Sequence, residues 1–180
     1  MADDAVVKSI RERLFFDPET SVYALLDGAS VKELLDKLYG EEPPEYACLY
    51  SGELEPDMAE VAPYLARLDP EAGFAEWVLA EGWGNHWGVF VVSNDDLLAM
   101  RRHFRRFTKV LDPDGKYLYF RFYDPRVLRV FLPTCMPDEL DEFFGSVLYF
   151  ALEDEDPARM LRYSFKEGKL RREEIKLGEK

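Results

Sequence analysis

The 180-residue sequence contains only two cysteines and no long apolar run. Cys48 and Cys135 form no CxxC pair, which excludes a disulfide scaffold and a zinc ribbon and favours a reducing compartment. No apolar run approaches the roughly 18–20 residues of a membrane span. Residues 2–8 have the wrong charge for a signal or transit peptide. We therefore expect a soluble cytoplasmic protein with no membrane partner.

Catalytic motifs are also lacking. The sequence contains no GxGxxG, Walker lysine loop, HExxH or GxSxG pattern. The two histidines, His86 and His103, fall in separate predicted elements, and no spacing selects either as a catalytic base. We therefore expect a protein that is not an enzyme, with no catalytic residue, no metal and no cofactor.

Positive charge is scarce, with 23 Lys and Arg against 36 Asp and Glu and a net charge of −13. The imbalance lies in residues 1–100, which carry 6 basic and 21 acidic residues, whereas residues 101–180 carry 17 and 15. The chain as a whole would repel nucleic acid and anionic membranes, so nucleic acid is not an expected partner unless a local basic patch binds it. A basic protein partner would be steered toward the first half.

Apolar residues are plentiful, at 47% hydrophobic and 14% aromatic, which excludes a disordered chain. The length favours one domain over residues 1–180. Helix and strand patterns alternate throughout and predict a mixed α/β (α+β) domain, a mixed sheet flanked by helices, with a polar hairpin at the C-terminus. Helices are expected in 1–19, 30–40, 70–83, 94–107, 125–133 and 137–145, and strands in 21–26, 46–50, 61–68, 87–92, 108–111, 116–123, 147–152 and 161–177.

Local signals set several of these boundaries. Ser30 and Glu33 match a capping box at the start of the second helix. Pro63 favours an edge position for the strand at 61–68. Ser93 or Asn94 is expected to cap the helix at 94–107.

Two dense acidic runs span residues 53–60 and 138–142. They fit a solvated surface and a helix start whose dipole favours negative charge. The alternative is a metal-dependent hydrolase that uses the clustered carboxylates.

The helix at 94–107 carries four arginines in six residues, at positions 101, 102, 105 and 106. An apolar stripe at helical spacing is expected to face the core and contains Leu97, Met100, Phe104 and Phe107. Three interpretations of the arginines stay open. They bind an anion or nucleic acid weakly, they neutralise the acidic first half within the fold, or they dock a protein partner.

Residues 117–123 alternate with a period of two. One side of the predicted strand is apolar and expected in the core, and contains Leu118, Phe120 and Phe122. The other side carries amphipathic residues, namely Tyr117, Tyr119, Arg121 and Tyr123. A tyrosine–arginine strip of this kind is typical of a recognition surface, and equally of a strand that a helix covers.

Asp124-Pro125 then predicts the start of a short helix, with Asp124 as the N-cap and proline at the first helical position. Arg126 and Arg129 lie three residues apart on this helix. We expect them to pair with Asp124 and with the acidic helix at 138–142.

Several segments together resemble a known family. They are Tyr23-Ala24-Leu25-Leu26-Asp27, Leu49-Tyr50, Ala62-Pro63-Tyr64-Leu65, Trp87-Gly88-Val89-Phe90, Arg101-Arg102-His103-Phe104-Arg105, Phe143-Phe144-Gly145 and, most specifically, Phe120-Arg121-Phe122-Tyr123-Asp124-Pro125-Arg126-Val127-Leu128. The chain resembles the adaptors, or effector chaperones, of the bacterial type VI secretion system over about residues 20–152. Residues 1–19 would form an N-terminal helix and 153–180 a C-terminal extension.

The resemblance implies a cytoplasmic, non-catalytic protein that holds a toxic effector, often by its N-terminal segment, and helps load it onto the VgrG spike. Its expected partners are the effector and VgrG, while the oligomeric state stays open. The candidate partner-binding residues are Trp87, Arg101, Arg102, Arg105, Tyr119, Arg121, Tyr123, Arg126 and Arg129, and Asp124 and Pro125 form a structural motif.

Overall fold

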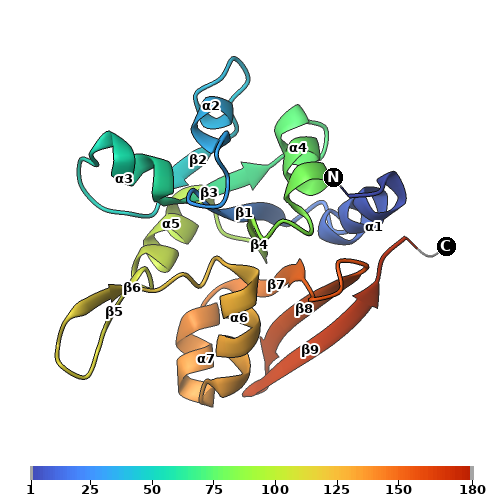
Figure 1. The fold of residues 1–180 in the computed structure, drawn as a ribbon. Coiled ribbons are helices and arrows are strands. Elements are labelled where there is room, and N and C mark those ends of the chain that lie inside the picture. Colours follow the sequence, from blue (N-terminus) through green and yellow to red (C-terminus); the bar gives the residue numbers. More distant parts are fainter. Residues whose placement is uncertain (1, 179–180) are drawn as a thin grey trace.

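A computed structural model describes residues 2–178. Its centre is a seven-stranded sheet of order β2-β3-β1-β4-β7-β8-β9, covered by helices on both faces (Figure 1). The strands are β1 (Ser21–Asp27), β2 (Tyr46–Cys48), β3 (Pro63–Leu68), β4 (Gly88–Ser93), β7 (Val147–Glu153), β8 (Arg159–Lys166) and β9 (Lys169–Lys176). The mixed α/β domain is confirmed, although all six pairings among these described strands are antiparallel.

Two hydrophobic cores lie on opposite faces of the sheet. The first contains buried residues of α1, α2 and α4, and the second contains buried residues of α5, α6 and α7. The helices are α1 (Asp4–Leu14), α2 (Leu34–Leu38), α3 (Pro56–Val61), α4 (Gly73–Gly82), α5 (Leu97–Arg105), α6 (Pro125–Phe131) and α7 (Pro137–Phe144), with a short 3-10 turn η1 (Leu132–Thr134) after α6. No helix in residues 2–178 combines the length and apolar character needed to cross a bilayer.

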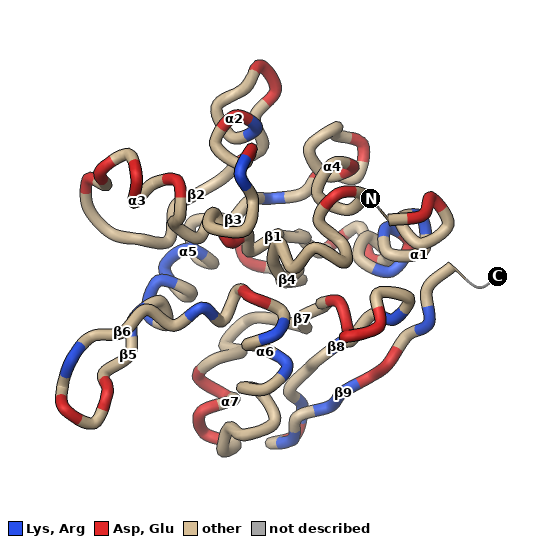
Figure 2. The backbone as a smooth tube through the Cα atoms, viewed as in Figure 1, with Lys and Arg blue, Asp and Glu red and all other residues tan. Residues whose placement is uncertain are grey.

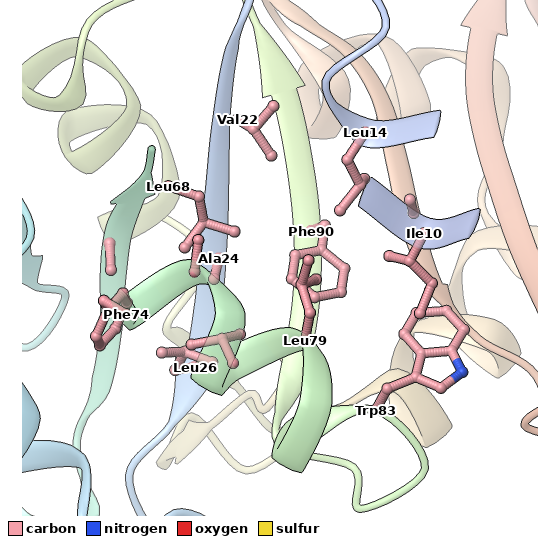
Figure 3. Close-up of a cluster of buried hydrophobic side chains, with 14 of the residues drawn as sticks. Ile10, Leu14, Val22, Ala24, Leu26, Leu68, Phe74, Leu79, Trp83 and Phe90 are labelled. Carbon is pink, nitrogen blue, oxygen red and sulfur yellow. The ribbon is translucent and has the colours of Figure 1, made fainter. Parts of the chain in front are cut away.

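The alternating side chains of β1 divide between the two cores. Val22, Ala24 and Leu26 pack in the first core with α1 and α4, as Figure 3 shows. Tyr23 and Leu25 pack in the second core. A strand that is covered on both faces is apolar almost throughout, and the run Val-Tyr-Ala-Leu-Leu has this character.

Three local predictions about helix starts and strand positions are wrong. Ser30 forms no capping box, because its hydroxyl donates to the Asp27 carboxylate at 2.9 Å and α2 begins only at Leu34. Asp96, rather than Ser93 or Asn94, caps α5 by accepting from the Ala99 N–H at 2.8 Å. Strand β3 is internal, between β2 and β1. Pro63 is its first residue, a position where a strand tolerates proline.

The predicted hairpin after α5 is confirmed but is shorter than expected. It consists of β5 (Lys109–Leu111) and β6 (Tyr117–Tyr119), which form their own two-stranded sheet. The strand predicted to reach residue 123 ends at Tyr119. The Asp124 N–H then bonds to the Arg121 carbonyl at 3.0 Å in a turn that leads into α6.

The polar hairpin at the C-terminus, β8–β9, is also confirmed. Strand β8 pairs with β7, so this hairpin extends the main sheet. Helix α7 has the expected limits, with Pro137 at its start and Gly145 after its end.

Candidate protein-binding surface

Asp124 organises the start of α6. It is 3% exposed, and its Oδ1 accepts from the Arg126 backbone N–H at 2.9 Å, which confirms the predicted cap. The Arg126 guanidinium also donates to both carboxylate oxygens, from Nε at 3.0 Å and from Nη2 at 2.7 Å. This two-pronged geometry is the strong form of an arginine–carboxylate contact. The predicted pairing of Arg126 with Asp124 is therefore confirmed.

Arg121 joins this cap to the end of β1. Its Nη2 pairs with the carboxylate of Asp27, which is 1% exposed, and lies 3.7 Å from Asp124 Oδ2. Asp27 also accepts from the Ala29 N–H and the Ser30 hydroxyl. One guanidinium thus bridges two buried carboxylates from segments far apart in the sequence. About half of the Arg121 side chain stays open to solvent.

The charge of Asp124 is stabilised by these contacts. Burial alone would raise the pKa of Asp124. The hydrogen bonds from the side chain and backbone of Arg126, together with the nearby charge of Arg121, outweigh burial and hold the pKa of Asp124 below its ordinary value. Asp124 is therefore ionised at neutral pH and acts as a structural anchor.

Arg129 does not pair with the acidic helix as predicted. Its Nη1 donates to the Glu153 backbone carbonyl at 3.0 Å, at the end of β7. Helix α6 directs Arg129 toward this strand end, and the ion pair to α7 within the described residues comes from Arg106, at 3.8 Å from Glu142. Arg129 therefore ties α6 to the main sheet.

The predicted tyrosine–arginine strip is divided by the early end of β6. Tyr123 is buried at 2% exposure, with its hydroxyl 3.4 Å from the Tyr50 hydroxyl, and burial raises its pKa. The expectation that Tyr123 lies on an exposed strip is therefore wrong, and its role in partner binding stays a prediction. Tyr119 stays half exposed, with its ring 4.8 Å from the Tyr50 ring. Leu118, which was expected in the core, is also exposed, because the β5–β6 hairpin extends away from the body of the protein (Figure 1).

This hairpin displays a concentrated apolar surface. Five of its large apolar side chains are 41–69% exposed, namely Val110, Leu111, Tyr117, Leu118 and Tyr119. A two-stranded hairpin is marginally stable by itself in water, and all six strand residues of this one are exposed. Sequence reasoning missed this surface, since apolar alternation alone does not show that a strand pair stands apart from the main sheet.

The apolar stripe of α5 is confirmed, with Met100 and Phe104 fully buried. The arginines occupy the remaining faces of the helix. Arg105 Nη2 donates to the Tyr50 carbonyl at 2.7 Å, which joins α5 to the tyrosine pair beside the hairpin. Arg101 is partly buried, and Arg102 is exposed. The structure thus links Arg105 to Tyr119 through Tyr50, and Arg101 and Arg102 lie one turn earlier on the same helix.

Trp87 lies apart from these residues. Its ring packs 4.7 Å from that of Trp77, and both line a hollow of about 580 Å³ with Lys37 and Glu81. This tryptophan pair packs against the first core, whereas α5 and α6 pack in the second. Trp87 therefore lies on one face of the sheet and the arginines of α5 on the other. Arg121 and Arg126 contact Asp27 and Asp124, and Arg129 binds the end of β7.

The histidines have separate structural roles. His103 lies 2.8 Å from the Phe143 carbonyl through Nε2. Burial lowers the pKa of His103, against the opposing effect of this hydrogen bond. His86 pairs with the buried carboxylate of Glu153. Within residues 2–178, no group of three or more His, Cys, Asp or Glu residues is arranged to hold a metal ion.

The structure thus defines a mixed α/β domain with a projecting apolar hairpin and a basic helix beside it. By sequence, the chain belongs to the family described as a domain of unknown function, DUF4123, whose model matches residues 22–142. The match begins in β1 and ends in α7, so it contains every candidate residue named above. Neither the curated proteins nor the solved structures gave a match.

Proposed function

We propose that this protein is a type VI secretion adaptor that binds an effector polypeptide and helps load it onto the VgrG spike in the cytoplasm. Two findings support the proposal. The family match over residues 22–142 covers most of the segment whose motifs resemble such adaptors. The observation that carries it is the β5–β6 hairpin, which exposes five large apolar side chains beside the arginines of α5.

The exposed hairpin favours association with another polypeptide. Apolar surface removed from water contributes about 25 cal/mol per Å². Tyrosine and arginine are enriched among the residues that dominate binding energy at protein interfaces. A partner that covers the hairpin would bury apolar groups that this chain alone leaves in water. No chemical step is needed for this role.

The Asp27–Arg121–Asp124 network would support binding by fixing the hairpin's exit. Arg121 lies two residues after Tyr119, and its guanidinium bridges the two buried carboxylates. At the base of the hairpin, the Phe120 N–H donates to the Thr108 carbonyl at 3.0 Å, joining the residue after β6 to the residue before β5. A hairpin held at its base loses less conformational freedom on binding, which favours affinity.

The test is co-expression with a type VI effector and a VgrG protein from the same genome, followed by co-purification. The variant Leu111→Ser/Tyr117→Ser changes a directly opposed pair on the hairpin. The control is Phe16→Ser, at an 85% exposed aromatic residue after α1. We expect wild type and the control to retain the effector and the hairpin variant to lose it. The proposal is refuted if wild type captures neither protein.

A further inference from the structure

The C-terminal half of α5 and the first hairpin strand form a basic surface in an acidic protein. Residues 97–111 contain five basic residues and no Asp or Glu. Arg106 lies 3.8 Å from Glu142. Among the described residues, no carboxylate lies within 4.0 Å of the side-chain nitrogens of Arg101, Arg102, Arg105 or Lys109. This surface therefore has unbalanced positive charge, although acidic residues outnumber basic ones in the chain.

Two of these arginines also have unused hydrogen-bonding capacity. The Nε atoms of Arg101 and Arg105 are buried and have no hydrogen-bond partner. Arginine is suited to carboxylates because its planar donors match the two carboxylate oxygens. Because the Nε atoms themselves are enclosed, an acidic side chain from a partner would pair with the solvent-accessible part of these half-buried arginines.

The basic surface is continuous with the apolar hairpin. Arg105 donates a hydrogen bond to the Tyr50 carbonyl, and the Tyr50 ring packs against the Tyr119 ring on β6. Lys109 then lies 5.6 Å above the Tyr119 ring. The Tyr50–Tyr119 pair therefore connects the positive side chains of α5 to the apolar side chains of the hairpin.

We propose that this surface binds an acidic segment of the effector, with carboxylates on Arg101, Arg102 and Arg105 and with apolar side chains on the hairpin. This inference rests on the proposed adaptor function and specifies the chemistry of the segment that is held. Helix α5, which carries these arginines, also packs against β2, an edge strand of the described seven-stranded sheet.

Charge around the surface favours a short polypeptide segment over nucleic acid. Figure 2 shows the blue of α5 together with red segments on α3, the hairpin and α7. These acidic positions include Asp57 on α3, Asp112 and Asp114 at the hairpin turn, and Glu142 on α7. A nucleic acid carries a charge at every phosphate and would meet this acidic border as it left the basic surface. A polypeptide segment with only a few carboxylates would not bring negative charge against this acidic border.

The test compares two matched charge reversals in the full chain, co-expressed with the effector used above. Arg102→Glu reverses a charge on the proposed surface, and Arg13→Glu is the control on α1. Both arginines are exposed and lie in the last turn of their helices. We expect Arg102→Glu to weaken effector binding at least about tenfold, Arg102→Lys to retain it, and Arg13→Glu to match wild type. Thermal melts check that each variant is folded.

Carbodiimide cross-linking then identifies the partner groups. In the Arg102→Lys variant, a zero-length link is expected from the amine introduced at position 102 to effector Asp or Glu residues, read by mass spectrometry. If wild type binds no effector, the adaptor function itself fails. If wild type binds and folded Arg102→Glu binds equally well, only the acidic-segment inference is overturned. A 20-base-pair DNA that shifts with wild type but not with Arg102→Glu at low salt would also overturn it.

Discussion

Asp124 gives the sharpest test of how the hairpin and α6 are held. Asp124→Ala removes a helix cap, which is worth about 1 kcal/mol. It also removes the carboxylate that Arg126 and Arg121 share, but both arginines are about half exposed and their charges would be solvated. Such ion pairs contribute about 0–1 kcal/mol. We therefore expect a total loss of about 1–3 kcal/mol, and a Tm lower by about 2–12 °C for a chain of this size.

The variant Arg126→Ala removes the ion pair with Asp124 but leaves the helix cap intact, so it measures the ion pair alone. Asp124 would keep its hydrogen bond from the residue 126 backbone N–H and its contact with Arg121. We therefore expect a loss below about 1 kcal/mol. Urea denaturation followed by circular dichroism measures both variants. An Arg126→Ala variant that is destabilised as much as Asp124→Ala would refute the assignment of the cap as the main contribution.

The pH dependence of the same variants tests the charge of Asp124. Because the pKa of Asp124 is lower in the folded protein than in the unfolded chain, its contribution is fully present above the unfolded value of about 3.9. The contribution is lost as the pH falls through the pKa that Asp124 has in the folded protein. The stability curves of wild type and Asp124→Ala should therefore converge on acidification below about pH 4. A gap that stays constant or widens there would contradict the argument.

Three further variants test the packing around the site. Gly145→Ala should cost about 3 kcal/mol or more by urea denaturation, because Gly145 has φ +50° and an added Cβ would lie 2.7 Å from the His103 ring. Gly115→Ala should cost only about 1–2 kcal/mol in the same assay, since its φ is +79° but the space around it is open; equal losses would contradict the clash. Tyr123→Phe removes only the buried contact with the Tyr50 hydroxyl, so it should change stability by less than about 1.5 kcal/mol and leave effector co-purification unchanged. Loss of the effector by a folded Tyr123→Phe protein would place Tyr123 in the interface after all.

Signals that act within a few residues predicted much of the fold. Asp124-Pro125 marked the start of α6, and Pro137 and Gly145 marked the limits of α7, because caps and backbone geometry depend on immediate neighbours. The strand expected at 21–26 is likewise present as β1, and its apolar run is typical of a strand covered on both faces.

The errors arose where distant residues decide the outcome. Ser30 suits a helix cap, but the buried Asp27 carboxylate takes its hydroxyl. The alternation of residues 117–123 is regular, yet the chain turns after Tyr119 and buries Tyr123 against Tyr50, 73 positions earlier. Arg121 pairs with Asp27 across 94 positions. Composition identifies such charged and aromatic groups, but only the fold determines which of them meet.

Amide hydrogen exchange of the chain, alone and in complex with its co-expressed effector, tests the central claim most directly. The account predicts a stable complex in which protection increases in α5 and in the β5–β6 hairpin, with little change around Trp87. Failure to form any complex would contradict the adaptor function. A complex whose protection lies elsewhere, with α5 and the hairpin unchanged, would contradict the binding surface.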